Sequence, residues 1–508
     1  FFVTMKDSMK INFFLSISLG ILSGIILGMF LPIEDINQYI HWIILSIIAW
    51  ILLLKKLIHV QSIILIFCIT SIAIGIGFWR TDQFHKKYSF NSFDQYQNKT
   101  ITLVGTIRGV PILKPGKQSV RIHPELINGT KVFGKSLDIV ITTTDLESFT
   151  IGDRMLVSGK FSLRENFLSD SGRVVQYRLM SYSKRIVGDI RYPKIDRIIH
   201  TQTHQIENSF FQIKSYFVKT LNQIYISPAS GLLSGIIIGD TSSLDSSLLE
   251  IFRLVGLIHI VVLSGYNITL IANSFVRLFS SFGYYRRLIA AIIALSLFIL
   301  IVGISPTSTR AGIMALSAFT ARYFIKPYVI TRGIILALVI MVWLSPYTIL
   351  FDLSLQLSFL ATIGIVYIFP ILQERYERFA ENSFGEILLQ TLAVNVMTLP
   401  LIIYQMGYFS PISFPVNILV LGLIPWITIF GFISVFVGMI ILPIGQVIAF
   451  PIQIIINSII EFSIWTSKHD PVQMTFGTFP VYWMLGVYGL LAGILVYYAA
   501  RKRVRVSS

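Results

Sequence analysis

GLIHIVVLSGYNITLIA, residues 256–272, has the length and apolarity of a membrane-spanning helix, yet polar residues interrupt it. His259 lies near its start, and Ser264 and Asn267 lie at its centre. Interrupted spans are tolerated where the freed backbone is buried in protein or lines a water-filled cavity. Close packing of helices through small residues is the alternative reading of the Ser-Gly pair. Asn267 and His259 on the same segment favour the lined cavity, although His259 also suits a membrane interface.

The composition extends this reading to the whole chain. Of 508 residues, 54% are hydrophobic and 13% are charged, and the mean hydropathy is +0.74. Soluble domains carry about 25% charged residues, so the sequence predicts an integral membrane protein. The first apolar run, 11–31, lacks the small-residue cleavage site of a signal peptide and is followed by more runs. A single cysteine, Cys68, excludes an internal disulfide.

Three apolar runs come first, at 11–31, 40–54 and 58–79, and they form a predicted N-terminal three-helix segment, 1–89. Basic residues around them place the N-terminus in the cytoplasm, because basic loops prefer that side. Further spans are predicted near 254–275, 288–304, 311–325, 333–351, 353–370, 386–404, 412–441, 447–466 and 480–500. Basic loops at 277–287, 322–332 and 501–505 then also lie inside. We therefore predict about 12 transmembrane helices plus a half-helix at 232–239. The region around Pro425 could contain an extra pair of membrane crossings.

Residues 90–200 have a different character. Apolar and polar residues alternate in TITLVGTI (100–107), SVRI (119–122), LDIVITTT (137–144) and RMLVSGKF (154–161), with turn signals between them. Short alternating strands at this spacing predict a small β-barrel or sandwich, and the third span leads it outside the membrane. Residues 99–200 hold 17 Lys and Arg against 9 Asp and Glu, which is half of the net charge of +16. An amphipathic helix at 204–225 follows, and it opens a channel domain at 201–508.

Candidate functional residues lie in the interrupted spans. GLLSGIIIGDTSSLD (231–245) contains Asp240, and adjacent interrupted segments are typical of a transport site. SPTSTRAG (305–312) places Arg310 at the outer side or at depth, against the trend for basic residues. Asp352 and Gln356 are one helical turn apart and share a face. The predicted channel-lining set is Asp240, Arg253, His259, Ser264, Asn267, Arg310, Asp352, Gln356, Asn395 and Asn417.

Several kinds of chemistry do not fit. GTKVFGKS (129–136) matches the phosphate-loop pattern, but a strand-like segment follows where that motif requires a helix. Its lysines, Lys131 and Lys135, belong better to a basic surface. The eight histidines form no metal-binding pair with the spacing of a zinc protease. Ser264 lacks a base and an orienting carboxylate at a supporting spacing. We therefore predict no enzyme activity, no metal and no cofactor.

The segment GIIIGDTSSLD…FRLVGLIHIVVLSGYNITLI (235–271) resembles the ComEC family, the membrane channel of bacterial natural transformation. The resemblance continues through STRAGIMAL (308–316), DLSLQLSFLATIGI (352–365) and the residues TLP, FS and VN between 398 and 417. GDRMLVSGKFS (152–162) resembles the last strands of the family's OB-type barrel. The family commonly has His where this chain has Asn267. Many members also carry a C-terminal metallo-β-lactamase-like nuclease, which we expect another protein to supply.

The resemblance implies a multi-pass channel of the cytoplasmic membrane that moves single-stranded DNA inward, with both termini cytoplasmic and the barrel outside. A separate DNA receptor, a nuclease and a cytoplasmic ATPase motor are the implied partners, besides the lipid bilayer. A polar pore with sparse positive charge suits a polyanion, because a dense ring of arginines traps it. Arg310 and Arg253 are the candidates for that charge.

The barrel is expected to bind DNA through basic and aromatic side chains. The predicted residues are Lys131, Lys135, Arg154, Lys160, Tyr177, Arg178 and Tyr182, with Phe161 as a further stacking candidate. Attraction to anionic lipid headgroups is the alternative for the barrel's charge. Two rival functions for the whole chain are a transporter or flippase for another anionic or lipid-linked substrate, and a structural membrane scaffold.

Overall fold

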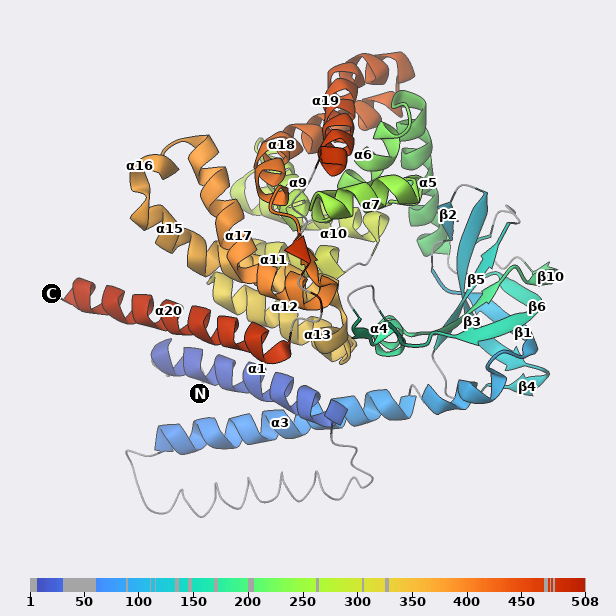
Figure 1. The fold of residues 1–508 in the computed structure, drawn as a ribbon, viewed down its shortest axis with the longest axis horizontal. Helices are drawn as coiled ribbons and strands as arrows, with labels where there is room; N and C mark the ends of the chain where they lie inside the picture. Colours follow the sequence, from blue (N-terminus) through green and yellow to red (C-terminus); the bar gives the residue numbers. More distant parts are fainter. Residues whose placement is uncertain are drawn as a thin grey trace.

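The computed structural model describes residues 7–30, 61–87, 90–109, 111–114, 116–132, 137–144, 149–168, 172–199, 205–261, 265–303, 306–324, 329–469, 474–475, 477 and 480–507. A β-barrel lies at one end of the molecule and a bundle of helices makes up the rest (Figure 1). The N-terminal end of α1 and the C-terminal end of α20 both lie away from the barrel (Figure 1). The predicted span 40–54 and the predicted site residues Ser264 and Lys135 lie outside the described residues.

The first two described helices, α1 (Asp7–Phe30) and α3 (Gln61–Lys87), pack closely along their length. Glycines make this approach possible: a Cβ on Gly24 would lie 2.0 Å from the carbonyl oxygen of Ile74. Association of helices in lipid depends on such small residues, because the hydrophobic effect does not drive it there. These helices include residues 11–30 and 61–79 of the predicted spans 11–31 and 58–79, and the other residues of those spans lie outside the described part.

The barrel confirms the small β-barrel predicted from alternation. Its elements are a 3-10 helix (Phe90–Tyr96), β1 (Thr100–Ile107), β2 (Ile112–Lys114), β3 (Lys117–Ile127), β4 (Thr130–Lys131), β5 (Asp138–Thr143), β6 (Arg154–Leu163), β7 (Phe167–Leu168), β8 (Val174–Val175), α4 (Tyr177–Ser183), β9 (Ile186–Arg191) and β10 (Lys194–Ile199). The strand order β1-β3-β5-β9-β6 closes because β6 also pairs with β1, and β5–β9 is the parallel pair. Inward side chains such as Leu103, Ile122 and Val157 are fully buried.

The barrel is attached to the bundle through the turn that follows α12. Tyr347 in that turn is 7% exposed and belongs to the hydrophobic core of the barrel. Its hydroxyl lies 2.7 Å from Nε2 of His85 at the end of α3. Ser345 donates to the carbonyl oxygen of Ser183 at the end of α4, at 2.7 Å. Because aromatic packing and hydrogen bonds join the two parts, the barrel has a defined orientation on the membrane bundle.

The bundle comprises α5 (Gln205–Ile224), α6 (Ala229–Ile238), α7 (Ser246–Leu254), α8 (Ile258–Val261), α9 (Gly265–Leu278), α10 (Tyr284–Val302), α11 (Pro306–Tyr323), α12 (Ile330–Leu344), α13 (Thr348–Phe351), α14 (Leu353–Ile363), a π-helix (Gly364–Ile368), α15 (Phe369–Arg375), α16 (Glu377–Ala380), α17 (Ser383–Met406), β11 (Tyr408–Phe409), α18 (Ser413–Gly438), α19 (Leu442–His469), β12 (Met474–Thr475) and α20 (Val481–Ser507). The half-helix predicted at 232–239 is α6, and all ten of its residues are buried. A helix that is apolar on every side belongs at the centre of a bundle.

Six helices of the described residues are long and apolar enough to cross a membrane. They span Tyr284–Val302, Leu353–Arg375, Phe384–Met406, Ser413–Gly438, Leu442–His469 and Val481–Tyr498. Three shorter apolar helices, Phe14–Phe30, Ala229–Ile238 and Ile330–Leu344, accompany them. The chain is therefore a polytopic helical membrane protein with a β domain, and the number of 12 crossings is not confirmed.

Two contacts disagree with the predicted topology, in which every span crosses the membrane once and successive spans run in opposite directions. The amphipathic helix predicted at 204–225 is α5, and its Lys214 donates to the carbonyl oxygen of Val302 at 3.0 Å. Tyr216, two residues further, donates to the carbonyl oxygen of Met439 at 3.3 Å. The C-terminal ends of α10 and α18 therefore lie near the same end of the bundle. Strict alternation assigns them to opposite sides, so the disagreement falls on the Pro425-containing helix α18.

Candidate functional site

The two segments that the sequence predicts to be interrupted contact each other in the bundle. α6 is followed by Gly239 in the left-handed conformation. In the segment 256–272 the structure describes α8 as far as Val261 and α9 from Gly265, and residues 262–264, where the predicted interruption falls, lie outside the described residues. A Cβ on Gly235 would lie 2.2 Å from the carbonyl oxygen of Val261. Only glycine permits α6 to approach α8 this closely. Of His259, the structure describes the backbone and not the side chain.

The two asparagines predicted to line a path instead bind backbone carbonyls. Asn267 is 1% exposed and its Nδ2 donates to the carbonyl oxygen of Ile236 at 3.0 Å. Ile236 is in the last turn of α6, where carbonyls have no partner within the helix. Asn417 Nδ2 donates to the carbonyl oxygen of Gly256 at 3.4 Å, at the turn before α8. Both amides therefore satisfy the interrupted backbone, as the close-packing alternative requires.

Asp240 and Arg253 occupy less central positions than predicted. Asp240 is half-buried, and its Oδ1 accepts a hydrogen bond from the backbone N–H of Ser242 at 3.0 Å, which shapes the turn after α6. Arg253 is exposed in the last turn of α7. In this conformation Arg253 therefore does not contribute charge to the interior of the bundle, contrary to the prediction.

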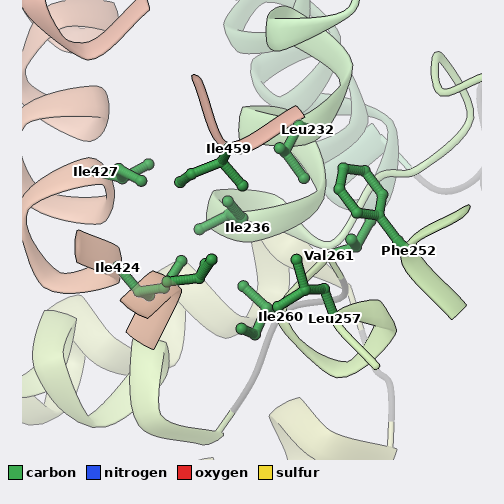
Figure 2. A pocket seen from close by; sticks show the side chains of 10 residues that line it. Leu232, Ile236, Phe252, Leu257, Ile260, Val261, Ile424, Ile427 and Ile459 are labelled. Carbon is green, nitrogen blue, oxygen red and sulfur yellow. The ribbon is translucent and has the colours of Figure 1, made fainter. Parts of the chain in front are cut away.

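A small closed cavity of about 10 Å³ lies between α6, α8, α18 and α19. Figure 2 shows that the side chains around it are apolar and point toward one another. They are Leu232, Ile236, Phe252, Leu257, Ile260, Val261, Val420, Ile424, Ile427 and Ile459. A volume of this size accepts about one water molecule, and a cavity without polar lining stays dry. The bundle is therefore closed at this point.

Arg310 on α11 is the buried charge that the sequence predicts. It is 8% exposed, and its Nη1 donates to the carbonyl oxygen of Ser358 and to the hydroxyl of Thr362, both on α14. Its guanidinium lies 5.8 Å from the ring centre of Phe359. Nε has no hydrogen-bond partner among the described residues, and none of their ion pairs involves Arg310. Burying a charge without a counter-ion is costly, so this position favours an incoming anion.

The remaining bundle residues surround α14. Asp352 is its N-cap and accepts from the backbone N–H of Ser354 at 3.0 Å. Gln356 donates to the carbonyl oxygens of Ile349 and Leu350, so it secures the turn after α13. Asn395 is half-buried on α17, which packs against α14. The structure thus places Arg310 of α11 against α14, the helix that carries Gln356, and it gives Asp352 and Gln356 backbone-binding roles.

In the barrel, two predicted stacking residues are core residues. Tyr182 is 2% exposed and Phe161 is fully buried, so neither ring presents a face to a base. Arg178 donates to the hydroxyl of Tyr182 at 2.9 Å and pairs with Asp94 at 2.8 Å. Burial raises the pKa of the Tyr182 phenol, and the hydrogen bond with Arg178 opposes that shift.

The other predicted barrel residues lie at the surface, apart from each other. Lys131 and Lys160 are exposed on β4 and β6. Arg154 is exposed and pairs with Glu125 at 2.7 Å. Tyr177 is half-buried, with its ring 5.7 Å from that of Phe167. The strongest grouping of cations is elsewhere on the barrel.

That grouping, which sequence reasoning missed, follows the outer face of β3, β5 and β9. We define the basic stripe as Lys117, Arg121, Lys184, Arg185, Arg191 and Tyr192. Lys117 and Arg121 have the same parity on β3 and therefore face outward together. Parity within KQSVRI (117–122) is the one sequence signal for them. The approach of β9 to β5 is a long-range event that no local pattern shows.

Burial first, and then the neighbouring cations Arg164 and Arg185, lower the pKa of Arg121, while Asp138 opposes the shift. The nearby acids are already paired: Arg164 donates twice to Asp189, at 2.8 and 2.7 Å, and Asp138 lies 3.8 Å from Nε of Arg121. The stripe therefore carries a surplus of positive charge.

Among the described residues, no group of three His, Cys, Asp or Glu side chains has the arrangement of a metal site. The described residues instead form a basic barrel surface beside a helical bundle, and the bundle contains the buried guanidinium of Arg310, which has no ion-pair partner among them.

A family model described as "Competence protein" matches residues 236–502, which include α7 to α19 and all but the end of α20. ComE operon protein 3 of Bacillus subtilis (strain 168) is 22% identical over 210 residues. The match covers 41% of this chain and 26% of that protein, so the chain corresponds to about a quarter of the relative's length. No solved structure matches the chain.

The matched region contains Arg310, Asn267, Asn417 and the interrupted helices that the resemblance to the ComEC family rests on. Because the family model covers more than half of the 508 residues, this chain belongs to the competence protein family.

Proposed function

We propose that this protein moves single-stranded DNA inward across the bacterial cytoplasmic membrane during natural transformation. Family membership supports a role in DNA uptake. The observation that carries the proposal is Arg310, a guanidinium that is 8% exposed and bonded only to neutral oxygens. A phosphodiester is the anion that a DNA strand brings past it, and planar guanidinium is suited to phosphate.

The bundle in this structure is a closed state in the proposed cycle. The cavity beside α6 is apolar and about 10 Å³, far too small for a nucleotide. Passage therefore requires α11 and α14 to separate at Arg310, whose bonds to Ser358 and Thr362 join them. In the proposed open state, phosphate replaces these two oxygens as the partner of Arg310.

The proposal assigns a place to each part of the chain. The barrel, with its surplus of cations, lies outside the membrane and receives the strand, while both termini are cytoplasmic. The common position of α1 and α20 ends opposite the barrel supports this orientation. A separate receptor, a nuclease and an ATPase motor complete the pathway.

A transformation assay tests the role of Arg310. A strain that lacks its own member of the family is complemented with the wild-type chain, Arg310→Gln, Arg310→Lys or Arg322→Gln. Arg322 is an exposed residue of the same helix, which makes it a matched control. We expect Arg310→Gln to reduce transformation about 100-fold at normal membrane levels, because an intramembrane ionisable residue serves a pathway. Arg310→Lys should lose about 10-fold, since lysine keeps the charge but not the planar fork.

Arg322→Gln should transform like the wild type. Wild-type transformation by Arg310→Gln contradicts the proposed path. The second candidate function is a transporter or flippase for another anionic or lipid-linked substrate, and the same unpaired guanidinium suits a lipid phosphate. It gains support if the wild-type chain fails to restore transformation while the reconstituted protein moves an anionic fluorescent lipid between leaflets in an Arg310-dependent way.

A further inference from the structure

The basic stripe of the barrel ends at its junction with the membrane bundle. The Nη2 of Arg185 donates to the carbonyl oxygen of Leu344, the last residue of α12, at 3.3 Å. Arg121 donates to the carbonyl oxygen of Lys184 in the same turn. The turn 184–185 therefore lies between strand β3 of the barrel and the α12–α13 turn of the bundle.

The stripe extends away from this junction along the strands. In the register of the sheet, Arg121 is opposite Val140, and Thr142 is opposite both Ser119 and Arg191. Lys117, two residues beyond Ser119, lies with its ammonium 5.5 Å from the ring centre of Tyr192. The distance from Lys117 to Arg121 along β3 is about 13 Å at the usual rise per residue. The stripe is therefore a continuous row rather than a scatter of surface cations.

The side chains of the stripe are available to a ligand. Lys117, Lys184, Arg185 and Arg191 are all exposed, and Tyr192 is 55% exposed. Lys184 forms no ion pair with any residue that the structure describes. Arg121 differs, since its Nε is buried without a hydrogen-bond partner in the described part of the chain. A row of cations with an exposed ring matches the chemistry of a single nucleic-acid strand, whose phosphates bind cations and whose bases stack on aromatic rings.

We propose that the basic stripe is the phosphodiester-binding surface that delivers the strand from the barrel to the bundle at the α12–α13 turn. This inference rests on the proposed function and deepens it, because it locates the receptor step and its exit. From Arg185 the row leads to Leu344 and onward to α14, the helix whose Ser358 and Thr362 hold Arg310. Lys131, Arg154 and Lys160 are exposed cations of β4 and β6 outside the stripe, and Arg154 is already paired with Glu125.

The test measures binding of a fluorescent oligothymidylate to the full-length protein in lipid nanodiscs. The stripe variant is Lys117→Gln, Lys184→Gln, Arg191→Gln. These three residues are exposed, and their one described side-chain contact, that of Lys117 with the ring of Tyr192, lies within the stripe, so we expect the variant to fold. The matched control removes equal charge from exposed cations outside the stripe, as Lys131→Gln, Arg154→Gln, Lys160→Gln. We expect Kd to rise at least about 10-fold for the stripe variant and less than about 2-fold for the control.

The salt dependence gives an independent readout. Each lost phosphate contact lowers the slope of log K against log salt by about 0.7 for a single strand. The stripe variant should therefore lower the slope by about 2, and the control should leave it unchanged. Tyr192→Leu should weaken binding without a change in slope, because stacking releases no counter-ion. Equal losses in the two triple variants, or wild-type binding by the stripe variant, overturn the proposal.

Transformation separates this proposal from the function it rests on. If the wild-type chain restores transformation and the stripe variant does so equally well, the stripe is wrong and the uptake function stands. If the wild-type chain binds oligothymidylate through the stripe but never restores transformation, the site stands and the uptake function is wrong. A wild-type protein that binds no oligothymidylate overturns the stripe directly.

Discussion

The barrel and the bundle stabilise their polar side chains through different partners. In the barrel, charged side chains pair with each other: Arg164 binds Asp189, and Arg154 binds Glu125, both at 2.7 Å. In the bundle, the buried amides Asn267, Asn417 and Gln356 bind the backbone. Asn267, for example, donates to a carbonyl oxygen at 3.0 Å rather than to another side chain.

The difference follows from the surrounding solvent. Water screens charges at the barrel surface, so ion pairs there are tolerated and contribute little. Within lipid each unpaired backbone group costs several kcal/mol, so helix interruptions need a side chain that satisfies them. Arg310 combines the two situations: it binds backbone like the amides, but it carries a charge that no described carboxylate neutralises. That exception is why it marks the proposed path.

The largest expected effect tests whether close backbone approach holds the bundle together. In Gly235→Leu, the new side chain meets the carbonyl oxygen of Val261, where even a Cβ would lie at 2.2 Å. We expect a cost of about 3 kcal/mol or more from overpacking, and little folded protein. Size-exclusion chromatography of the detergent-solubilised protein measures the folded fraction. Gly489→Leu on α20 is the control, since nothing lies within 4 Å of that glycine's Cβ position.

A normal elution profile for Gly235→Leu would show that α6 and α8 adjust easily. The comparison between bundle and barrel would then lose its main support, because the interruption would not depend on a close backbone contact.

A middle-sized effect tests the amide that binds α6. Asn267→Leu removes the donor to the carbonyl oxygen of Ile236, and an unsatisfied buried acceptor costs about 1–3 kcal/mol. Thermal unfolding of the purified full-length protein measures the loss. Asn267→His keeps an N–H donor, so it should recover part of the stability. Equal stability of wild type and Asn267→Leu would contradict a backbone-satisfying role.

The smallest effect concerns a surface pair of the barrel. Arg178→Met removes the bonds to Asp94 and to the hydroxyl of Tyr182. Asp94 remains near water and the ring of Tyr182 stays packed in the core, so we expect a loss of about 1 kcal/mol in the same unfolding measurement. High salt should reduce the difference further, because salt screens exposed pairs. A loss larger than that of Asn267→Leu would reverse the proposed contrast between the two regions.

Much of the fold could be predicted from local sequence. The alternation in 100–107 and 154–161 corresponds to β1 and β6, because the side-chain period of a strand is a local property. The Gly-punctuated segment 231–245 contains the end of α6, whereas the predicted break at the polar centre of 256–272 falls on residues 262–264, outside the described residues. Arg310 was identified correctly as a charge at depth, because arginine inside an apolar segment is rare enough to be informative.

The site residues were harder to predict. Tyr182 was predicted to be an exposed stacking residue, yet α4 places its ring in the core of the barrel. Asn267 has the composition of a pore-lining residue, but its partner Ile236 is 31 residues away. Residue composition and hydrophobic periodicity do not show which distant segment of the chain contacts a given side chain. For the same reason the basic stripe, assembled from β3, β9 and the turn at 184–185, had no local signal.

The sequence by itself determined that this chain is a membrane protein of the competence family with a basic β domain, because hydropathy, alternation and motif order depend only on neighbouring residues. The tertiary structure decided which polar groups bind backbone, which cations stand together, and that apolar side chains fill the bundle beside α6. Those outcomes depend on contacts between segments far apart in the chain, where packing selects one partner among many of the same chemistry.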